Sequence, residues 1–217
     1  HDLARRQRQM CIRDSNYPGH TEYLGKVSKK KPLMIMLNQK LKVATLTTHI
    51  PISQITKKVT KKNLENTIQI YINSLTKDFG IINPKIAVSA LNPHSGEEGK
   101  IGKEEINIIK PVIDKFKKRG KTIYGPIPAD TMFHQDALKN IDANLCMFHD
   151  QALIPIKSSD FYGSINFTAG LPFIRTSPDH GTAFDIVGLN KANNSSLINA
   201  IKYVQMIYNQ RIKNEKK

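Results

Sequence analysis

The chain has 217 residues, with 33 Lys and Arg against 18 Asp and Glu, which gives a formal net charge of +15 at pH 7. This length suits one large domain or two small ones, and no run of 18 apolar residues exists, so we expect no transmembrane helix. The lysines are spread along helix-like stretches without a nucleic-acid-reading motif, which favours a solvated basic surface over a polyanion partner.

The two cysteines, Cys11 and Cys146, lie far apart in unlike contexts. They offer neither a disulfide framework nor a cysteine-based zinc site, and they suit a reducing, cytoplasmic compartment. Residues 1–15 carry four arginines and differ in composition from the lysine-rich remainder. We expect them to be a disordered, non-native leader, with the native sequence beginning upstream of Asn16; an amphipathic targeting segment is the alternative.

Apolar spacing and turn residues predict alternating strands and helices. A turn and a short helix should follow Tyr17, with Thr21 as a candidate N-cap. Apolar residues at helical spacing predict a long helix over 61–79, which Gly80 would end. The other expected elements are strands at 32–37, 41–46, 86–91, 122–124, 145–148, 166–168 and 173–176, and helices at 104–118, 130–140 and 195–211. The last helix would carry one apolar face, formed by Leu197, Ile201, Val204 and Ile207 or Tyr208. This alternation predicts an α/β fold.

Three histidines each follow a strand-like run: His49, His94 and His149. In an open α/β sheet, the ends of such strands lie side by side and border the crevice where ligands bind. Three imidazoles at one rim can hold a divalent metal and leave a coordination position open, although three unrelated polar histidines would fit the same wide spacing. The carboxylate of Asp150, next to His149, is suited to orienting a metal ligand.

Other segments carry groups suited to anions. Lys157, Asn166 and Arg175 fall on or near strand ends, where a cation and an amide suit phosphate or carboxylate; separate surface charges are the alternative. Residues 179–188 contain a His-Gly-Thr turn that would present N–H groups to an anion, or else form an ordinary capped loop. Residues 18–22 are either a capped helix start or a polar lip over a phosphate.

Several other catalytic motifs are missing from the sequence. No Gly-x-Gly-x-x-Gly follows a predicted strand, which argues against a Rossmann site. There is also no P-loop, nucleophile elbow or Cys–His pair. We expect His1 and His134 to be surface residues.

Taken in order along the chain, these motifs resemble the 4-hydroxythreonine-4-phosphate dehydrogenase family of the pyridoxal phosphate pathway. The resemblance runs from about residue 18 to about residue 207. It rests on Gly19-His20-Thr21-Glu22, Thr47-Thr48-His49, Leu91-Asn92-Pro93-His94, residues 125–131, His149-Asp150-Gln151 and residues 171–177 into Asp179-His180-Gly181-Thr182-Ala183. Several motifs in order are far more specific than any one of them. A departure is Glu98, where a glycine is expected.

The resemblance implies a two-domain α/β fold similar to isocitrate and isopropylmalate dehydrogenases, here lacking much of the first domain. Residues 16–156 would form a central metal-binding and dimerisation domain, and residues 157–217 the C-terminal part of the cofactor and substrate domain. A homodimer would form its active site at the subunit boundary. The matching metal ligands, shared between subunits, are His49, His94 and His149. The matching substrate-binding positions are His20, Thr21, Lys157, Asn166 and Arg175. The positions similar to a cofactor-adenine loop are His180, Gly181, Thr182, Ala183 and Asn193.

The implied reaction is the metal-dependent, NAD- or NADP-linked oxidation of 4-phosphohydroxy-L-threonine to 2-amino-3-oxo-4-(phosphonooxy)butanoate, which loses CO₂ to give 3-amino-2-oxopropyl phosphate. A divalent metal (Zn²⁺, Mg²⁺ or Co²⁺) would act as Lewis acid and the nicotinamide would accept the hydride. Lys157 is a candidate for proton transfer.

Three alternatives stay open. They are a dehydrogenase of threonate or erythronate 4-phosphate, an inactive metal-binding fragment, and a nucleic-acid-binding module. Family members are substantially longer at the N-terminus, so we expect this chain by itself to be a poor or inactive enzyme.

Overall fold

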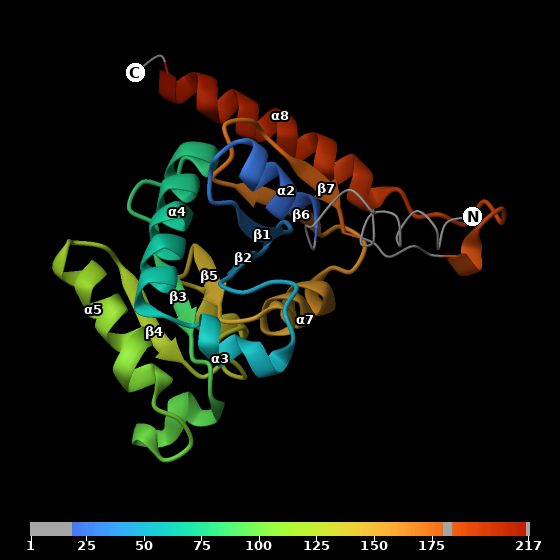
Figure 1. Cartoon of the computed structure of the whole chain (residues 1–217). Helices are drawn as coiled ribbons and strands as arrows, with labels where there is room; N and C mark the ends of the chain where they lie inside the picture. Colours follow the sequence, from blue (N-terminus) through green and yellow to red (C-terminus); the bar gives the residue numbers. More distant parts are fainter. Residues whose placement is uncertain (1–18, 180–183, 216–217) are drawn as a thin grey trace.

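A computed structural model of the chain describes residues 19–179 and 184–215. Over these residues, seven strands form one sheet with helices on both faces (Figure 1). The strands are β1 (Leu33–Leu37), β2 (Lys42–Thr45), β3 (Ile86–Ser89), β4 (Ile123–Ile127), β5 (Ala143–Cys146), β6 (Ile165–Ala169) and β7 (Thr176–Pro178). The α-helices are α2 (His20–Val27), α3 (Ile55–Lys58), α4 (Lys61–Phe79), α5 (Lys110–Lys118), α6 (Gln135–Leu138), α7 (His149–Ser159) and α8 (Ser195–Glu215). Shorter helical segments are η1 (Ile52–Gln54), η2 (Pro93–Gly99), η3 (Glu105–Ile109) and η4 (Phe184–Ile186).

The sheet is mixed, with strand order β4-β3-β5-β2-β1-β6-β7. Strands β2, β5, β3 and β4 pair in parallel, whereas β1 is antiparallel to both β2 and β6, and β6 is antiparallel to β7. The β1–β2 hairpin turns at Asn38, whose side-chain oxygen accepts the N–H groups of Lys40 and Leu41 at 2.9 and 2.8 Å. Because β2, β5 and β3 are parallel neighbours, their carboxyl ends meet at one edge of the sheet.

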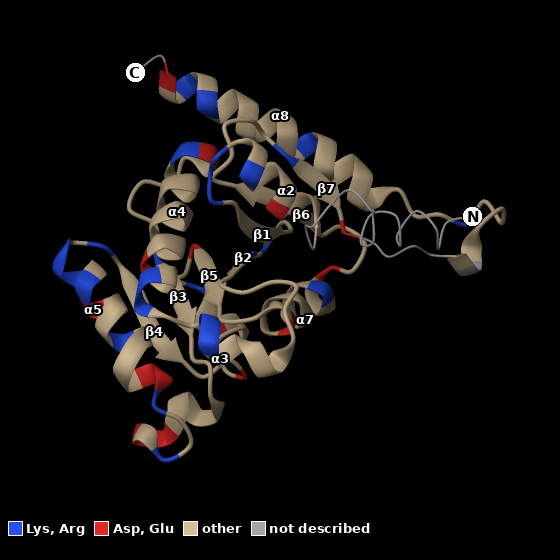
Figure 2. Cartoon of the chain, in the orientation of Figure 1, with Lys and Arg blue, Asp and Glu red and all other residues tan. Residues whose placement is uncertain are grey.

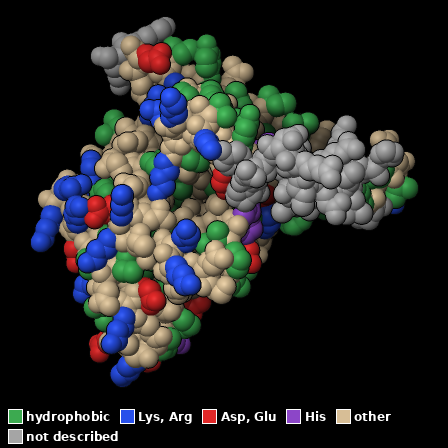
Figure 3. Space-filling model, in the orientation of Figure 1, with side chains coloured by type: hydrophobic (Ala, Val, Ile, Leu, Met, Phe, Trp, Pro, Cys, Tyr) green, Lys and Arg blue, Asp and Glu red, His purple; other side chains and the backbone are tan. Residues whose placement is uncertain are grey.

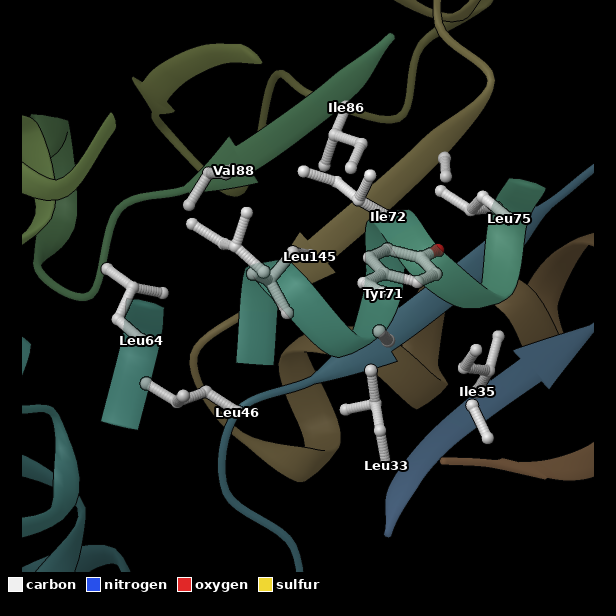
Figure 4. Close-up of a cluster of buried hydrophobic side chains, with 14 of the residues drawn as sticks. Leu33, Ile35, Leu46, Leu64, Tyr71, Ile72, Leu75, Ile86, Val88 and Leu145 are labelled. Carbon is white, nitrogen blue, oxygen red and sulfur yellow. The ribbon is translucent and has the colours of Figure 1, made fainter. Parts of the chain in front are cut away.

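Helix α4 covers one face of the sheet together with α5 and α8 (Figure 1). The Thr60 hydroxyl caps its start by accepting the N–H of Asn63 at 3.2 Å, and Gly80 ends it with a left-handed φ of 71°. Figure 4 shows its buried side chains packed against the strands, and the apolar residues concerned include Leu64, Tyr71, Ile72, Leu75, Leu33, Ile35, Ile86, Val88 and Leu145. Each large side chain buried in this way contributes roughly 1.5–3 kcal/mol. The helix expected over 61–79 is confirmed.

Helix α7 covers the opposite face, where Ala152 and Ile156 pack against Met34, Met36 and neighbouring side chains. Alternate residues of a strand point to opposite faces, and residues that are directly paired across strands share a face. Asn166 pairs with Met36 and Thr168 with Met34, so both polar side chains of β6 lie on the α7 face. This register places a polar patch beside α7 rather than in the core under α4.

Some local expectations are wrong. No helix is expected from the sequence directly after 145–148, yet α7 forms there and has Pro155 inside it, where proline is usually unfavourable. The helix expected over 130–140 is reduced to α6, and Gly19 rather than Thr21 is the N-cap of α2. The helix expected over 104–118 begins instead as the π-helical segment η3.

The apolar face expected for the last helix points mostly outward. The side chains of Leu197, Ile201, Val204 and Tyr208 are 51%, 62%, 38% and 55% exposed, whereas Ile207 is buried. Helix α8 packs instead through Ala200, through Tyr203, whose hydroxyl donates to the Asn38 carbonyl at 2.9 Å, and through an ion pair of 2.7 Å between Arg211 and Asp78. Small and polar contacts therefore decide how this helix is oriented.

The α/β class is confirmed. The expected domain boundary between residues 156 and 157 falls inside α7, and β6 and β7 extend the sheet beyond β1. The division into two domains similar to isocitrate dehydrogenase stays a prediction. Lys and Arg residues are spread over several helices (Figure 2). Within the described ranges, no helix is long and apolar enough to cross a membrane.

Candidate active site

Two of the three predicted metal ligands meet at the edge where β2 and β5 end. His49 lies four residues beyond the end of β2, and His149, the first residue of α7, lies three residues beyond the end of β5. Their ring centroids are 5.6 Å apart, and the ring planes are inclined by 48°. Both side chains are partly exposed, and Figure 3 shows histidine at the surface on this side of the molecule. The parallel pairing of β2 with β5 is what brings residues 100 positions apart together.

A carboxylate lies next to Nδ1 of each of these histidines. Asp150 Oδ1 is 2.7 Å from Nδ1 of His149, and Glu22 Oε1 is 3.8 Å from Nδ1 of His49. The first contact is a hydrogen bond; the second is too long for one and is an ion pair when His49 is protonated. Carboxylates on Nδ1 orient the ring and leave Nε2 available, as for metal-bound imidazoles.

The Glu22–His49 pair also changes how both groups ionise. The interaction with Glu22 raises the pKa of His49, although partial burial acts in the opposite direction. The same interaction with His49, with a smaller contribution from the Thr48 hydroxyl at 3.3 Å, lowers the pKa of Glu22. Glu22 is therefore an anion at neutral pH, held against a predicted metal ligand.

His94 occupies a different environment. It lies in η2, beyond the end of β3, and its side chain is exposed. Among residues 19–179 and 184–215, no three His, Cys, Asp or Glu side chains are close enough to hold one metal ion. Within a single chain, His49 and His149 thus lie close together, and His94 does not join them.

Arg175, Glu22, His49 and His149 form a strip of polar side chains along the sheet edge. Arg175 lies beside Glu22 and is the cationic end of this strip. Its guanidinium donates to the hydroxyls of Thr168 at 2.9 Å and Thr21 at 3.4 Å. Burial lowers the pKa of Arg175, and the negative charge of Glu22 opposes this effect. Among the described residues its acceptors are these two hydroxyls, so the half-buried guanidinium keeps donor capacity for an anion such as phosphate or carboxylate.

Asn166 shares the β6 face with Thr168. Its amide oxygen is buried, and in the described part of the chain it has no hydrogen-bond partner. A buried acceptor without a donor is unfavourable unless a ligand or water supplies one. Arg175 and Asn166 are therefore both suited to contact a bound molecule on the α7 side of the sheet.

Lys157 lines a cavity of about 520 Å³ along α7. Its ammonium group is 3.0 Å from Asp179 Oδ2 and lies 5.6 Å from the centre of the Phe161 ring. His149 and Asp150 line the same cavity, because they precede Lys157 by eight and seven positions and residues at these spacings share one helix face. A smaller cavity of about 200 Å³ adjoins it, lined by Thr48, His49, Ile50, Ile52, Ile55, Phe148, His149 and Asp150.

Residues 6–204 match a sequence model of the family described as pyridoxal phosphate biosynthetic protein PdxA. The chain belongs to this family. It is 46% identical over 191 residues to the 4-hydroxythreonine-4-phosphate dehydrogenase of Paracoccus denitrificans, covering 86% of this chain and 59% of that protein. It is 47% identical over 191 residues to that of Bradyrhizobium diazoefficiens, covering 86% of this chain and 55% of that protein. The chain therefore spans less than two thirds of the length of these relatives.

A solved structure agrees with this assignment. The crystal structure of 4-hydroxythreonine-4-phosphate dehydrogenase from Klebsiella pneumoniae superposes with a TM-score of 0.79 at 38% identity, covering 91% of this chain and 60% of that one. The recognition of the family from ordered motifs is therefore confirmed.

The remaining predicted positions of this PdxA family member are less informative. His20 is exposed at the first residue of α2. His180, Gly181, Thr182 and Ala183 lie outside the described residues. The side-chain oxygen of Asn193 accepts the N–H of Ser195, the first residue of α8, at 2.9 Å. His134 is exposed, as expected.

Three polar residues of the site were missed as site residues from the sequence. Glu22 stands in a quoted motif without an assigned role, and Thr168 carries no local signal. Gln151 accepts from the Ser89 hydroxyl at 2.9 Å and the Met147 N–H at 2.8 Å, and donates to the Ala90 carbonyl at 2.8 Å. It joins the ends of β3 and β5, from which the His94 loop and His149 both begin. Only knowledge of the strand order could have revealed this role.

The donors present fit a divalent metal in part. Two neighbouring imidazoles with carboxylates next to Nδ1 match the chemistry of a zinc-type site. No third His, Cys, Asp or Glu of the described residues completes a group with them.

Proposed function

We propose that this chain carries the metal- and substrate-binding part of a 4-hydroxythreonine-4-phosphate dehydrogenase. It would oxidise 4-phosphohydroxy-L-threonine with NAD or NADP in pyridoxal 5′-phosphate biosynthesis, in the cytoplasm. The observation that carries this proposal is one strip of polar groups along the sheet edge, in which Arg175, Glu22, His49 and His149 follow one another. The strip unites an anion-binding group with paired imidazoles, and the relatives named above carry that activity in their names.

His49 and His149 would hold a divalent metal (Zn²⁺, Mg²⁺ or Co²⁺) with His94 of a second copy. The exposure of His94 and the separate pairing of the other two histidines support a site shared across a homodimer. When bound, the metal would supply Lewis acidity at the substrate hydroxyl, and the nicotinamide would supply a hydride acceptor. His180, Gly181, Thr182, Ala183 and Asn193 are the proposed contacts of the cofactor adenine.

The other polar residues would bind and orient the phosphorylated substrate. Arg175 and Lys157 provide positive charge on the α7 side of the sheet, and Thr21, Asn166 and His20 provide polar contacts. Positive charge held in a partly desolvated site favours a phosphate or carboxylate more strongly than charge in open solvent does. Orientation by such fixed groups is a major part of what a protein contributes to hydride transfer.

Lys157 is the proposed proton-transfer residue. Its ammonium group lies in the cavity lined by His149 and is held by Asp179. A proton has to leave the hydroxyl during oxidation, and one has to reach the carbon that loses CO₂ from 2-amino-3-oxo-4-(phosphonooxy)butanoate. The product, 3-amino-2-oxopropyl phosphate, keeps the phosphate that Arg175 would bind.

Equilibrium binding of 4-phosphohydroxy-L-threonine, with and without Zn²⁺, tests the proposal without requiring turnover. We expect Zn²⁺ to increase the affinity for the substrate, and Arg175→Ala to decrease it. An analogue with hydroxyl in place of the amino group distinguishes a threonate- or erythronate-phosphate enzyme, which would bind that analogue more tightly. Substrate affinity that is independent of Zn²⁺ and of Arg175 would contradict the assignment.

A further inference from the structure

The loop that carries His94 has an unusual backbone. Five consecutive residues, 94–98, have φ between 44° and 76°, in the left-handed region. Only Gly96 among them is a glycine, and L residues with a Cβ reach this region at a cost in free energy. Such a turn persists only where surrounding contacts hold it, and these contacts can be traced.

Backbone N–H groups of Lys100 and Ile101 donate to the Glu97 and Gly96 carbonyls of the turn, both at 3.1 Å, and the segment just before it is held by the buried carboxylate of Glu105, at the start of the π-helical segment η3. Its Oε1 accepts the N–H groups of Leu91 and Asn92, both at 2.8 Å, and its Oε2 accepts the Asn92 side-chain amide at 3.0 Å. Three donors on one buried carboxylate offset the unfavourable burial of its charge. Glu105 therefore fixes the backbone immediately before His94.

The same carboxylate also restricts which residue type can occupy position 96, two residues after His94. A Cβ at Gly96 would lie 2.7 Å from Glu105 Oε2 and 2.7 Å from the Gly102 carbonyl oxygen. The Ser95 hydroxyl donates to the Pro126 carbonyl at 3.3 Å and ties the turn to β4. Hydrogen bonds thus hold the residues before and after His94, while the His94 side chain is exposed.

We propose that Glu105 is a positioning residue for His94. It holds the left-handed turn so that the His94 imidazole points away from its own chain, ready to complete the metal site of a second copy. This inference rests on the proposed function, in which His94 is the third metal ligand. A ligand on a preorganised turn loses little conformational entropy on coordination, whereas a ligand on a flexible loop would lose more.

Co²⁺ titration followed by visible absorption tests the role, because the spectrum reports the ligand set as well as the affinity. In Glu105→Gln the amide group would face the Asn92 amide donor, so the turn should loosen. We expect Co²⁺ affinity to fall by up to about 10–100-fold, the loss known for removing a direct hydrogen-bond partner of a metal ligand, with an altered spectrum at saturation. If this variant does not fold, Asn92→Ala, which removes only side-chain donation to Glu104 and Glu105, should weaken Co²⁺ binding in the same direction.

Asp78→Asn is the matched control. Asp78 is also a buried carboxylate with two partners, Ser74 at 2.6 Å and Arg211 at 2.7 Å, but these partners belong to α4 and α8. We expect this variant to lower the unfolding temperature without changing the Co²⁺ spectrum.

Two results would overturn the proposal, and they differ. If His94→Ala weakens Co²⁺ binding but Glu105→Gln and Asn92→Ala do not, Glu105 does not position His94 and the proposed function still stands. If His94→Ala and His149→Ala both leave Co²⁺ affinity unchanged, the metal site fails, and the role of Glu105 fails with it.

Discussion

The His49–His149 edge and the His94 loop hold their histidines in opposite ways. At the edge, each imidazole has a carboxylate neighbour and the two rings lie 5.6 Å apart, so side-chain contacts define the site. In the loop, the hydrogen bonds hold the backbone, and the histidine itself is exposed. Predicted ligands can thus be positioned either by their own partners or by the conformation of the chain that carries them.

This difference matters for how a shared site would assemble. The edge is formed within one chain by the pairing of β2 with β5. The loop presents an exposed histidine, and no group of three metal-binding side chains occurs in the described residues. The following predictions test this contrast, from the largest expected effect to the smallest.

His149→Ala should cause the largest loss at the edge. It removes a proposed ligand and that ligand's contact with Asp150, and loss of a hydrogen-bond partner of a ligand alone costs about 10–100-fold in metal affinity. We expect Zn²⁺ affinity, measured by competition with a chelating dye, to fall more than about 100-fold. His134→Ala removes an exposed histidine elsewhere and should have no effect. Equal affinities of the two variants would contradict the site.

Arg175→Ala should weaken anion binding at the other end of the strip. A hydrogen bond to a charged group is worth about 1.5–3 kcal/mol, which corresponds to roughly a 10–100-fold loss of affinity. Calorimetric titration with the phosphorylated substrate would measure this. Arg119→Ala, in which the lost guanidinium lies over the Phe116 ring on a distant helix, is the control. A loss of the same size in both would indicate nonspecific attraction by the net positive charge.

Gly96→Ala against Gly120→Ala measures how tightly the His94 loop is packed. Both glycines have φ near 75°, so both variants carry the backbone cost of about 1 kcal/mol. A Cβ at Gly120 meets nothing within 4 Å, whereas a Cβ at Gly96 lies 2.7 Å from Glu105. We expect Gly96→Ala to lower the free energy of unfolding by a further 1–3 kcal/mol or so in urea denaturation. Equal values for the two variants would mean that the loop adapts easily.

The Glu22–His49 pair should give the smallest effect, visible in the pH dependence of the metal-free protein. Glu22 has a lowered pKa, so its contribution to stability is present above its usual value of 4.5 and is lost as the pH falls through the folded pKa. His49 has a raised pKa, so its contribution is present below 6.5 and is lost as the pH rises through the folded pKa. Both contributions therefore coexist between about pH 4.5 and 6.5.

We expect Glu22→Gln to destabilise the protein most near pH 5.5 and less near pH 8, by at most about 0.5 kcal/mol because both groups are partly exposed. In NMR titrations the pKa of His49 should fall in this variant, because the carboxylate that raises it is gone. An unchanged pKa of His49 would mean that Glu22 does not hold it.

The sequence alone determined the local elements and the candidate ligands. Helix α4 follows from its apolar spacing, its Thr60 cap and Gly80, since these are contacts between residues close in the chain. The family was recognised from ordered motifs around His20, His49, His94 and His149.

Tertiary structure decided which of these residues meet. The helical spacing on α8 identified an apolar stripe, but Leu197 and Ile201 face outward, because periodicity describes a face and not what covers it. Helix α7 forms despite Pro155, since burial of Ala152 and Ile156 against the sheet outweighs local preference. The pairing of β2 with β5 brings His49 next to His149, which depends on contacts between residues distant in the chain. The His94 loop depends on a left-handed backbone conformation and on hydrogen bonds to Glu105. Patterns of single residues in the sequence encode neither arrangement.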